Sequence, residues 1–303
     1  MIEPILHHFD WSPYAEKIRV LFGLKRLAWR SVQVPMVMPK PDLTALTGGY
    51  RKTPVLQVGA DVYCDTSCIA RELERRYPSP TLFPEGGAGL AYALATWAER
   101  FFEPGAGLSM SGNEALPAEL LQDRREFFTH MDFDRFAERT PHMRGQVLAQ
   151  LALLETHLVD GRAFLGGDRA GLADATAYYV VWMLRAFVAG GDAVLSRHLR
   201  LAAWESRVRA LGHGQRREID ATEALTEART STPTPGHGVA ADDPSGLQEG
   251  QAVSVTPDDY GKVPVRGELV TLDATCVALR RRDPRAGEVV VHFPRLGYVV
   301  AAA

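Results

Sequence analysis

The chain has 303 residues, of which 46% are hydrophobic and 23% are charged. This composition is typical of a globular protein with more than one core, and it excludes extensive disorder. The formal net charge of −3 excludes a strong overall field that would attract nucleic acid or an anionic membrane, so we expect neither as a partner.

The cysteines and the apolar stretches indicate a cytoplasmic protein. Cys64, Cys68 and Cys276 form no paired framework, and the first ten residues lack a basic leader and an apolar core. The spacing of Cys64 and Cys68 is unlike that of zinc ligands, so we expect no metal. The most apolar stretch, 175–190, contains Arg185 and is shorter than the ~20 apolar residues that span a bilayer, which predicts a buried helix.

Residues 1–84 alternate between strand and helix patterns and predict an α/β domain. Strand patterns occur in PILHHF and WRSVQV, and helix patterns in SPYAEKIRVLFGLK and KPDLTALTGG. A hairpin is predicted for TPVLQVGADVYC, and a closing helix for TSCIARELERRYP. The order βαβαββα predicts a four-stranded mixed sheet covered by helices.

Residues 85–230 have helical periodicity throughout and predict an all-helical domain. It follows the connector PSPTLFPEGG. Apolar stripes mark helices near Trp97–Phe102, Leu120–Phe128, Val147–Leu158, 173–188 and 199–211, and Asp220–Glu223 has a capping-box pattern that predicts the start of a last short helix. The Pro- and Gly-rich residues 231–246 predict a flexible linker.

Residues 247–303 form the last predicted domain, which we call the extension. Five short strand patterns occur there, in QAVSV, GELVTL, CVALR, EVVVHF and GYVVA. They predict a small, closed, SH3-like β-barrel, and we expect it to gain stability by docking on the helical domain. The segment Arg280-Arg281-Arg282 is basic, but the extension contains seven Lys and Arg against seven Asp and Glu. These arginines therefore indicate a solvated strand end rather than a nucleic-acid surface.

The sharpest chemical signal is Ser12-Pro13-Tyr14-Ala15, at the turn from the first strand to the first helix. An ordinary helix start explains it by itself, because serine is a favoured N-cap and proline a favoured first residue. The segment also resembles the Cys-Pro-Tyr-Cys motif of thioredoxin-fold proteins with both thiols replaced. Chemistry at such a site needs a sulfur brought by a ligand, and the missing thiols disfavour a thiol-disulfide oxidoreductase.

Two further motifs occur in the order that the thioredoxin fold requires. Lys52-Thr53-Pro54-Val55 resembles its cis-proline turn, and Asp65-Thr66 resembles the acidic and hydroxyl pair that begins its third helix. Residues 1–230 therefore resemble cytosolic glutathione transferases, closest to the serine- and cysteine-type classes and similar to bacterial zeta- and omega-like members. The resemblance extends through Leu82-Phe83-Pro84, Phe164–Asp168 and Leu172-Ala173-Asp174. The family usually has Ser or Thr where this chain has Gly171, so we expect a weaker helix cap there.

The resemblance implies that Ser12 donates a hydrogen bond to the sulfur of glutathione, with Tyr14 as a rival donor. A free thiol titrates near 8.5, and lowering its pKa by about two units corresponds to roughly 2.7 kcal/mol. A hydrogen bond to a charged group contributes about 1.5–3 kcal/mol and a helix N-terminus about 0.3–1 kcal/mol. One serine at a helix start can therefore supply the stabilisation.

The resemblance also implies how the rest of glutathione is held. Pro54, if cis, would shape the edge where the main chain of Val55 meets the cysteinyl part of the ligand. Asp65 and Thr66 would hold the γ-glutamyl end, and Lys52 would reach the glycyl carboxylate.

From the resemblance we expect a homodimeric glutathione transferase that directs the thiolate at a small electrophile, as in detoxification. The helical domain would hold the electrophile, with Trp97, Phe101 and Phe102 as candidates, although core packing explains these aromatic residues better. The alternative is a non-catalytic scaffold of the same architecture in which the extension recruits a partner.

Overall fold

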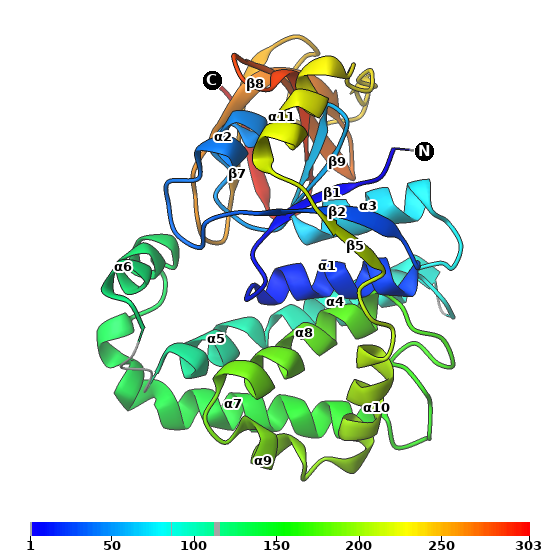
Figure 1. Ribbon diagram of the computed structural model, residues 1–303, viewed down its shortest axis with the longest axis vertical. Helices are drawn as coiled ribbons and strands as arrows, with labels where there is room; N and C mark the ends of the chain where they lie inside the picture. The colour runs from blue at the N-terminus through cyan, green and yellow to red at the C-terminus, as the bar shows by residue number, and fades with distance from the viewer. Residues whose placement is uncertain (1, 86, 112–115) are drawn as a thin grey trace.

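The computed structural model describes residues 2–85, 87–111 and 116–303. Figure 1 shows the thioredoxin-like part in the middle, the helical part below it and the extension above it. The predicted order βαβαββα is confirmed. Its elements are β1 (Ile5–His8), α1 (Pro13–Leu24), β2 (Ala28–Gln33), α2 (Pro41–Thr47), β3 (Val55–Val58), β4 (Asp61–Cys64) and α3 (Thr66–Arg76). Strand β1 pairs parallel with β2 and antiparallel with β3, which pairs antiparallel with β4.

The helical part confirms the predicted helices as far as Arg209, but the prediction of an all-helical domain to residue 230 is wrong at Gln215–Glu218, which form a strand. Its helices are α4 (Gly87–Glu99), α5 (Phe102–Met110), α6 (Ala118–Phe127), α7 (Phe136–His157), α8 (Leu172–Phe187), α9 (Gly191–Leu195) and α10 (Leu199–Arg209), with a 3-10 turn at Phe133–Arg135. Helix α8 is almost wholly buried and packs against α1, α4 and α5. In the described parts of the chain, no helix combines the length and apolarity needed to cross a membrane.

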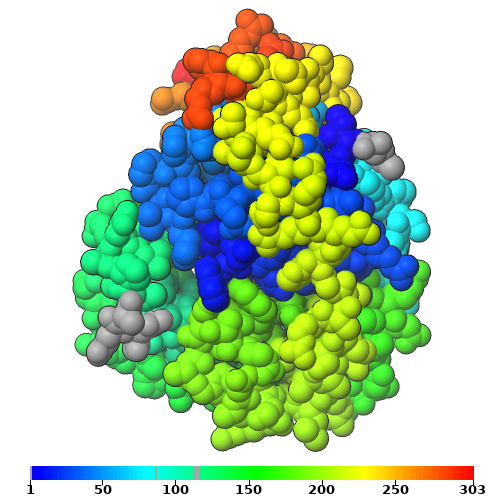
Figure 2. Space-filling model, in the orientation of Figure 1, coloured from blue at the N-terminus to red at the C-terminus, as the bar shows by residue number. Residues whose placement is uncertain are grey.

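The chain then returns to the thioredoxin-like part. Strand β5 (Gln215–Glu218) pairs parallel with β2, and helix α11 (Ala221–Thr230) begins after Asp220, whose carboxylate accepts from the Glu223 N–H at 2.7 Å. Figure 2 shows this segment, in yellow, lying along the N-terminal part. Within 231–246, Thr234 donates two hydrogen bonds to Asp61 on β4, and β6 (Gly238–Val239) pairs with the extension.

The extension contains the five predicted strands, but they do not form a closed barrel. They are β7 (Ala252–Pro257), β8 (Val265–Leu272), β9 (Cys276–Asp283), β10 (Gly287–Pro294) and β11 (Tyr298–Ala302). Strand β10 pairs parallel with β4, with Val291 opposite Val62. Within the described residues, one open sheet runs in the order β11-β7-β8-β9-β10-β4-β3-β1-β2-β5.

The composition of β10 explains why the sheet of the extension continues into the sheet of the thioredoxin-like part. Val289, Val290 and Val291 are all buried, as in a central strand covered on both faces. The core around β10 is shared with the thioredoxin-like part, because Leu43 of α2 and Leu225 of α11 belong to the same apolar cluster. The extension therefore docks on the thioredoxin-like part through β10, and in the described residues the loop 258–264 contacts the helical part.

Candidate functional site

A cavity of about 1480 Å³ lies where the three parts of the protein meet. The thioredoxin-like part contributes the start of α1, the turn before β3 and the start of α3. Helices α4, α5 and α6 form the facing wall, and the loop 258–264 of the extension enters from the side. The cavity is larger than the ~300–1,000 Å³ of ordinary ligand pockets, so it has room for two small molecules.

Ser12 lines this cavity as the N-cap of α1. Its Oγ accepts a hydrogen bond from the Ala15 N–H at 3.2 Å, and its own N–H donates to the Phe9 carbonyl at 3.1 Å. In the part of the chain that the structure describes, the hydroxyl hydrogen of Ser12 has no protein acceptor. Because capping uses only a lone pair, the O–H group is available to a ligand.

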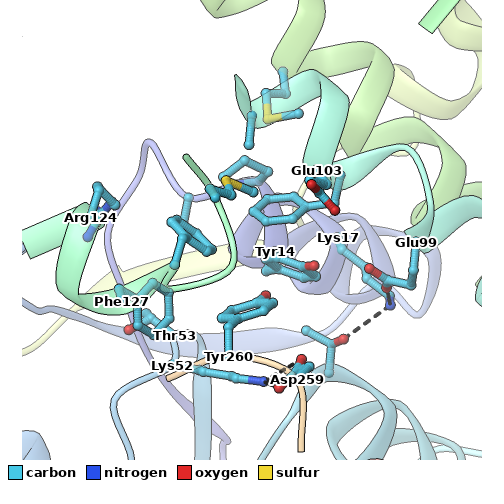
Figure 3. A pocket seen from close by; sticks show the side chains of 18 of the residues that line it. Tyr14, Lys17, Lys52, Thr53, Glu99, Glu103, Arg124, Phe127, Asp259 and Tyr260 are labelled. Atoms are coloured by element: carbon cyan, nitrogen blue, oxygen red, sulfur yellow. Dashed lines mark hydrogen bonds and ion pairs between the residues drawn. The ribbon is translucent and has the colours of Figure 1, made fainter. Parts of the chain in front are cut away.

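Tyr14 also lines the cavity, and its hydroxyl lies beside another cavity residue, Tyr260. Its ring packs between Phe102 and Tyr179, at centroid distances of 4.7 and 5.0 Å. Burial and the nearby Glu99 raise the pKa of Tyr14 well above its ordinary value, so the phenol stays protonated. Its hydroxyl faces that of Tyr260 from the extension (Figure 3). The Tyr14 hydroxyl thus has a protein neighbour, whereas the hydroxyl hydrogen of Ser12 has no acceptor among the described residues.

The turn before β3 agrees in part with the predicted cis-proline motif. The Thr53–Pro54 peptide bond is cis, and Lys52 and Pro54 line the cavity. Val55 is fully buried in the sheet and does not line it. A main-chain contact from Val55 to a ligand therefore stays a prediction.

Asp65 and Thr66 lie at the start of α3 and line the cavity. Asp65 has φ 77° and ψ 139°, a backbone conformation that costs a non-glycine residue about 1–3 kcal/mol. Its carboxylate accepts from the N–H and the hydroxyl of Ser67 at 2.8 and 2.7 Å. Thr66 Oγ1 accepts from Lys17 Nζ at 3.1 Å, which leaves the threonine O–H free to donate. Strain kept at a cavity wall is typical of a functional position.

Lys40 is a cavity residue that sequence reasoning missed. It is buried and donates to Thr53 Oγ1 at 3.1 Å, next to the cis-proline. Burial and the charge of Arg124 lower the pKa of Lys40 to about 8. Lys40 therefore carries a charge at neutral pH in a site suited to an anion. No sequence motif indicated it, because it precedes α2 and approaches Thr53 only in the fold.

The extension places Asp259 and Tyr260 in the cavity, and the sequence indicated neither as a site residue. Both oxygens of Asp259 accept hydrogen bonds from Lys52 Nζ, at 2.5 and 2.7 Å. The same nitrogen lies 4.2 Å from the centre of the Tyr260 ring. From β11, Tyr298 donates to Asp65 Oδ2 at 3.1 Å. Two residues that the sequence predicted to hold a ligand, Lys52 and Asp65, are thus in contact with the extension.

Aromatic packing anchors the loop 258–264 on the helical part. The Tyr260 ring lies 6.3 Å from Phe102 and 5.0 Å from Phe128. The Gly261 N–H donates to the Phe127 carbonyl at 3.2 Å, and a Cβ at Gly261 would come within 2.5 Å of the Phe127 ring. Gly261 also has φ 59°, so this close approach requires glycine.

Of the three aromatic candidates for an electrophile wall, Phe102 lines the cavity, whereas Trp97 and Phe101 do not. Phe101 is fully buried in the core and packs edge-on against Trp97. The helical part also lines the cavity with charged side chains such as Glu103, Arg124 and Arg139, and its apolar, sulfur-rich part consists of Met110, Phe127, Phe128, Met131, Phe136, Met143 and Met183. Such a surface suits a bulky apolar molecule.

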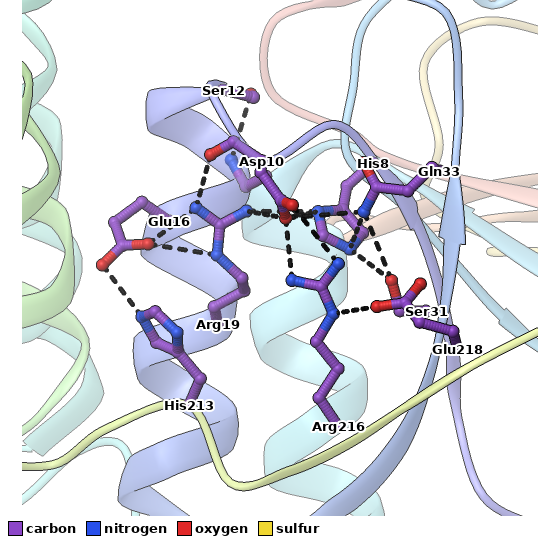
Figure 4. Close-up of polar contacts among 11 residues, drawn as sticks. His8, Asp10, Ser12, Glu16, Arg19, Ser31, Gln33, His213, Arg216 and Glu218 are labelled. Carbon is purple, nitrogen blue, oxygen red and sulfur yellow. Dashed lines mark hydrogen bonds and ion pairs between the residues drawn. The ribbon is translucent and has the colours of Figure 1, made fainter.

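A buried polar cluster braces the turn before Ser12 (Figure 4). Arg19 donates to the Asp10 carbonyl at 2.9 Å and pairs with Glu16 at 2.7 Å. His213, just before β5, has Nε2 3.0 Å from the other oxygen of Glu16. The cluster therefore fixes the chain that leads into α1.

One part of this cluster looks like a catalytic triad but has the wrong protonation. His8 Nε2 lies 3.0 Å from Ser31 Oγ, and His8 Nδ1 lies 3.8 Å from Asp10. Arg19 Nη1 lies 3.1 Å from His8 Nδ1, and because a guanidinium only donates, Nδ1 accepts and Nε2 carries the hydrogen. A triad base needs the opposite tautomer. Burial and Arg19 also lower the pKa of His8 to about 3, so the cluster is structural.

Among the residues that the structure describes, no three His, Cys, Asp or Glu side chains are arranged to hold a metal ion. The three cysteines are free, and burial raises the pKa of each thiol. These thiols are therefore poor nucleophiles.

Comparison with known proteins identifies the class. A family model for the N-terminal domain of glutathione S-transferases matches residues 6–81, and one for their C-terminal domain matches residues 137–207. The crystal structure of a GST-like protein from Pseudomonas syringae is 35% identical, with a TM-score of 0.83 over the full length of both chains. The chain belongs to the glutathione S-transferase family, and the extension is included in this match.

Two other relatives are more distant. FtsZ-localized protein A from Caulobacter vibrioides is 26% identical over 181 residues, which cover 58% of this chain and 75% of that protein. A glutathione S-transferase from Methylobacterium radiotolerans, solved in complex with glutathione sulfonate, is 21% identical and covers 72% of this chain and 97% of its own, with a TM-score of 0.52. The second similarity shows the fold alone.

Proposed function

We propose that the protein is a cytoplasmic glutathione transferase that ionises the thiol of glutathione beside Ser12 and directs it at an electrophile. The observation that carries the proposal is that Ser12 lines the cavity and caps α1 through its oxygen, while its hydroxyl hydrogen has no acceptor among the described residues. The donor and the helix N-terminus both favour a negative charge on sulfur.

The charges of the cavity support a ligand with two carboxylates and one ammonium. Asp65 and Thr66 would take the γ-glutamyl end, as the sequence predicted. Lys52 would reach the glycyl carboxylate, as the sequence predicted, although it already pairs with Asp259. Lys40, which contacts the neighbouring Thr53, would add a second positive charge at this end of the ligand.

The electrophile would lie against the apolar wall of α5, α6 and α7. Attack by the thiolate forms the new bond between sulfur and carbon, and the electron pair leaves with the leaving group or moves to an electronegative atom of the electrophile. The size of the cavity favours electrophiles larger than a simple aryl halide. Which electrophile the protein uses in the cell depends on this wall.

Turnover by Ser12→Ala tests the proposal. We expect the variant to bind glutathione but to lose about 10- to 100-fold in kcat/KM at pH 7 with a generic aryl halide, because it lacks one hydrogen bond of about 1.5–3 kcal/mol to the thiolate. Normal activity of this variant would contradict the proposal and assign the donor elsewhere, with Tyr14→Phe as the next variant.

Ser12→Thr is the matched control. Threonine keeps both the cap and the hydroxyl, whereas alanine also loses about 1 kcal/mol of helix capping. We expect Ser12→Thr to retain most of the activity. Equal losses in both variants would mean that packing at this position, and not the hydroxyl, controls turnover.

A non-catalytic scaffold is the second candidate. The name of the Caulobacter relative describes localisation with FtsZ and no reaction, which supports this alternative for the present chain. Retention on immobilised glutathione together with aryl halide turnover separates the two functions. A scaffold without a glutathione site would show neither. The family also leads us to propose a homodimer.

A further inference from the structure

The extension neutralises a charge that the thiol ligand would otherwise meet. Lys52 gives two hydrogen bonds to Asp259, at 2.5 and 2.7 Å, and its ammonium also lies over the Tyr260 ring. The Lys52 side chain is only 13% exposed. These contacts therefore replace much of the water around the ammonium and give it a fixed partner.

The Asp259 carboxylate is held there by the loop and is not a freely moving surface group. The neighbouring Asp258 N–H donates to the Gly297 carbonyl at 3.0 Å, and the Gly261 N–H donates to the Phe127 carbonyl at 3.2 Å. Tyr260 is clamped by aromatic rings of the helical part. The backbone on both sides of Asp259 is thus fixed.

A fixed carboxylate next to Lys52 changes which ligand group is favourable there. A ligand carboxylate would be attracted by Lys52 and repelled by Asp259 at a similar distance, so the two effects largely cancel. A neutral amide or ester is not repelled, and its carbonyl oxygen can still accept the third hydrogen bond of the ammonium.

We infer that Asp259 is a specificity-determining residue for the carboxyl end of the thiol ligand. It shifts the preference of the site from thiol tripeptides with a free C-terminal carboxylate toward those in which this group is an amide or an ester. The inference rests on the proposed function, because it requires a glutathione-like ligand that reaches from Ser12 toward Lys52.

The test compares two ligands that differ by one negative charge, glutathione and its glycine monoethyl ester, by calorimetry on the full chain. In Asp259→Asn we expect the ratio of the two dissociation constants to shift toward the free acid by about threefold to tenfold, as removal of a partly screened like charge predicts. The shift should come mainly from tighter binding of glutathione.

Asp258→Asn is the matched control, because it removes the same charge from the same loop but not from the contact with Lys52. It should leave the ratio unchanged within about twofold. An unchanged ratio in Asp259→Asn, or the same shift in Asp258→Asn, would overturn the inference. Weaker binding of both ligands by one common factor would do so too, since it would mark Asp259 as structural only.

Lys52→Gln provides a second variant should Asp259→Asn fail to fold. It leaves Asp259 unopposed, so the free acid should lose affinity by a larger factor than the ester, and equal losses would overturn the inference. A wild-type chain that binds neither ligand would instead reject the proposed function itself, and the inference would fall with it.

Discussion

Lys40 gives the cavity a charge that depends on pH. Its pKa of about 8 lies below the value near 10.4 of a free lysine. The ammonium is therefore present below pH 8 and is lost as the pH rises further. Because a bound carboxylate stabilises the protonated form, ligand affinity should fall as this proton leaves.

We predict that affinity for S-methylglutathione, which has no thiol to ionise, falls about threefold to tenfold between pH 7 and 9.5. Lys40→Arg should remove the part of this fall that comes from Lys40, because arginine keeps its charge. Calorimetry at several pH values measures both. Identical pH profiles for wild type and variant would show that Lys40 does not meet the ligand.

The residues of the site fall into two groups according to how far the sequence predicts them. Ser12, Lys52, Pro54 and Asp65 belong to local motifs, and the structure places them around one cavity. Lys40 approaches Thr53 only through tertiary structure, and Pro257-Asp-Asp259 has the composition of any turn. Nothing in one sequence shows which turn reaches a distant cavity.

At the scale of elements, the start of α8 explains why glycine replaces the usual Ser or Thr. A Cβ at Gly171 would lie 2.7 Å from Pro84 Cδ and 2.8 Å from the Leu82 carbonyl. Asp174 compensates, because it accepts from the N–H groups of Gly171 and Leu165 and from the indole of Trp204, at 2.8–2.9 Å. The weaker cap that the sequence predicted is thus supported from other elements.

We therefore predict that Gly171→Ser destabilises the protein by about 1–3 kcal/mol through overpacking. This loss exceeds the gain from the better N-cap, because serine caps a helix only a few tenths of a kcal/mol better than glycine. Denaturant unfolding measures this change. The control is Gly145→Ser on α7, where an added Cβ meets no atom within 4 Å among the described residues. That variant should lose no stability. A more stable Gly171→Ser would show that the junction can relax.

The sequence predicts poorly those strands and strand pairings that depend on contacts with distant parts of the chain. All four residues of β5 are exposed and polar, so no periodicity indicates a strand. The strands of the extension follow from their β-type runs, whereas their order in the sheet does not. The buried run Val289–Val291 was the available signal for a central strand.

At the scale of the whole molecule, the extension and the thioredoxin-like part share one core. Phe293 of β10 is fully buried and packs against Tyr50, at a centroid distance of 5.8 Å. Strand β10 also covers the edge of β4, so a second chain in the proposed homodimer must use another surface. Loss of the β10 contact should therefore destabilise both parts together.

We predict that Phe293→Ala lowers the free energy of unfolding by about 3–5 kcal/mol. Tryptophan fluorescence should detect this loss, because all five tryptophans lie at positions 11–204, outside the extension. Leu296→Ala, at a residue that is 80% exposed, should change stability by less than about 0.5 kcal/mol. An unchanged fluorescence transition in Phe293→Ala would mean that the extension unfolds independently.

The ionisation of glutathione in its complex with the protein tests the central claim most directly. A pH titration of the ultraviolet absorbance of the thiolate should give a pKa about two units below the free value of 8.5 for wild type. The same titration should give a value one to two units higher, roughly that of the free thiol, for Ser12→Ala. A bound thiol that titrates near 8.5 in wild type, or equally in both proteins, would contradict the account.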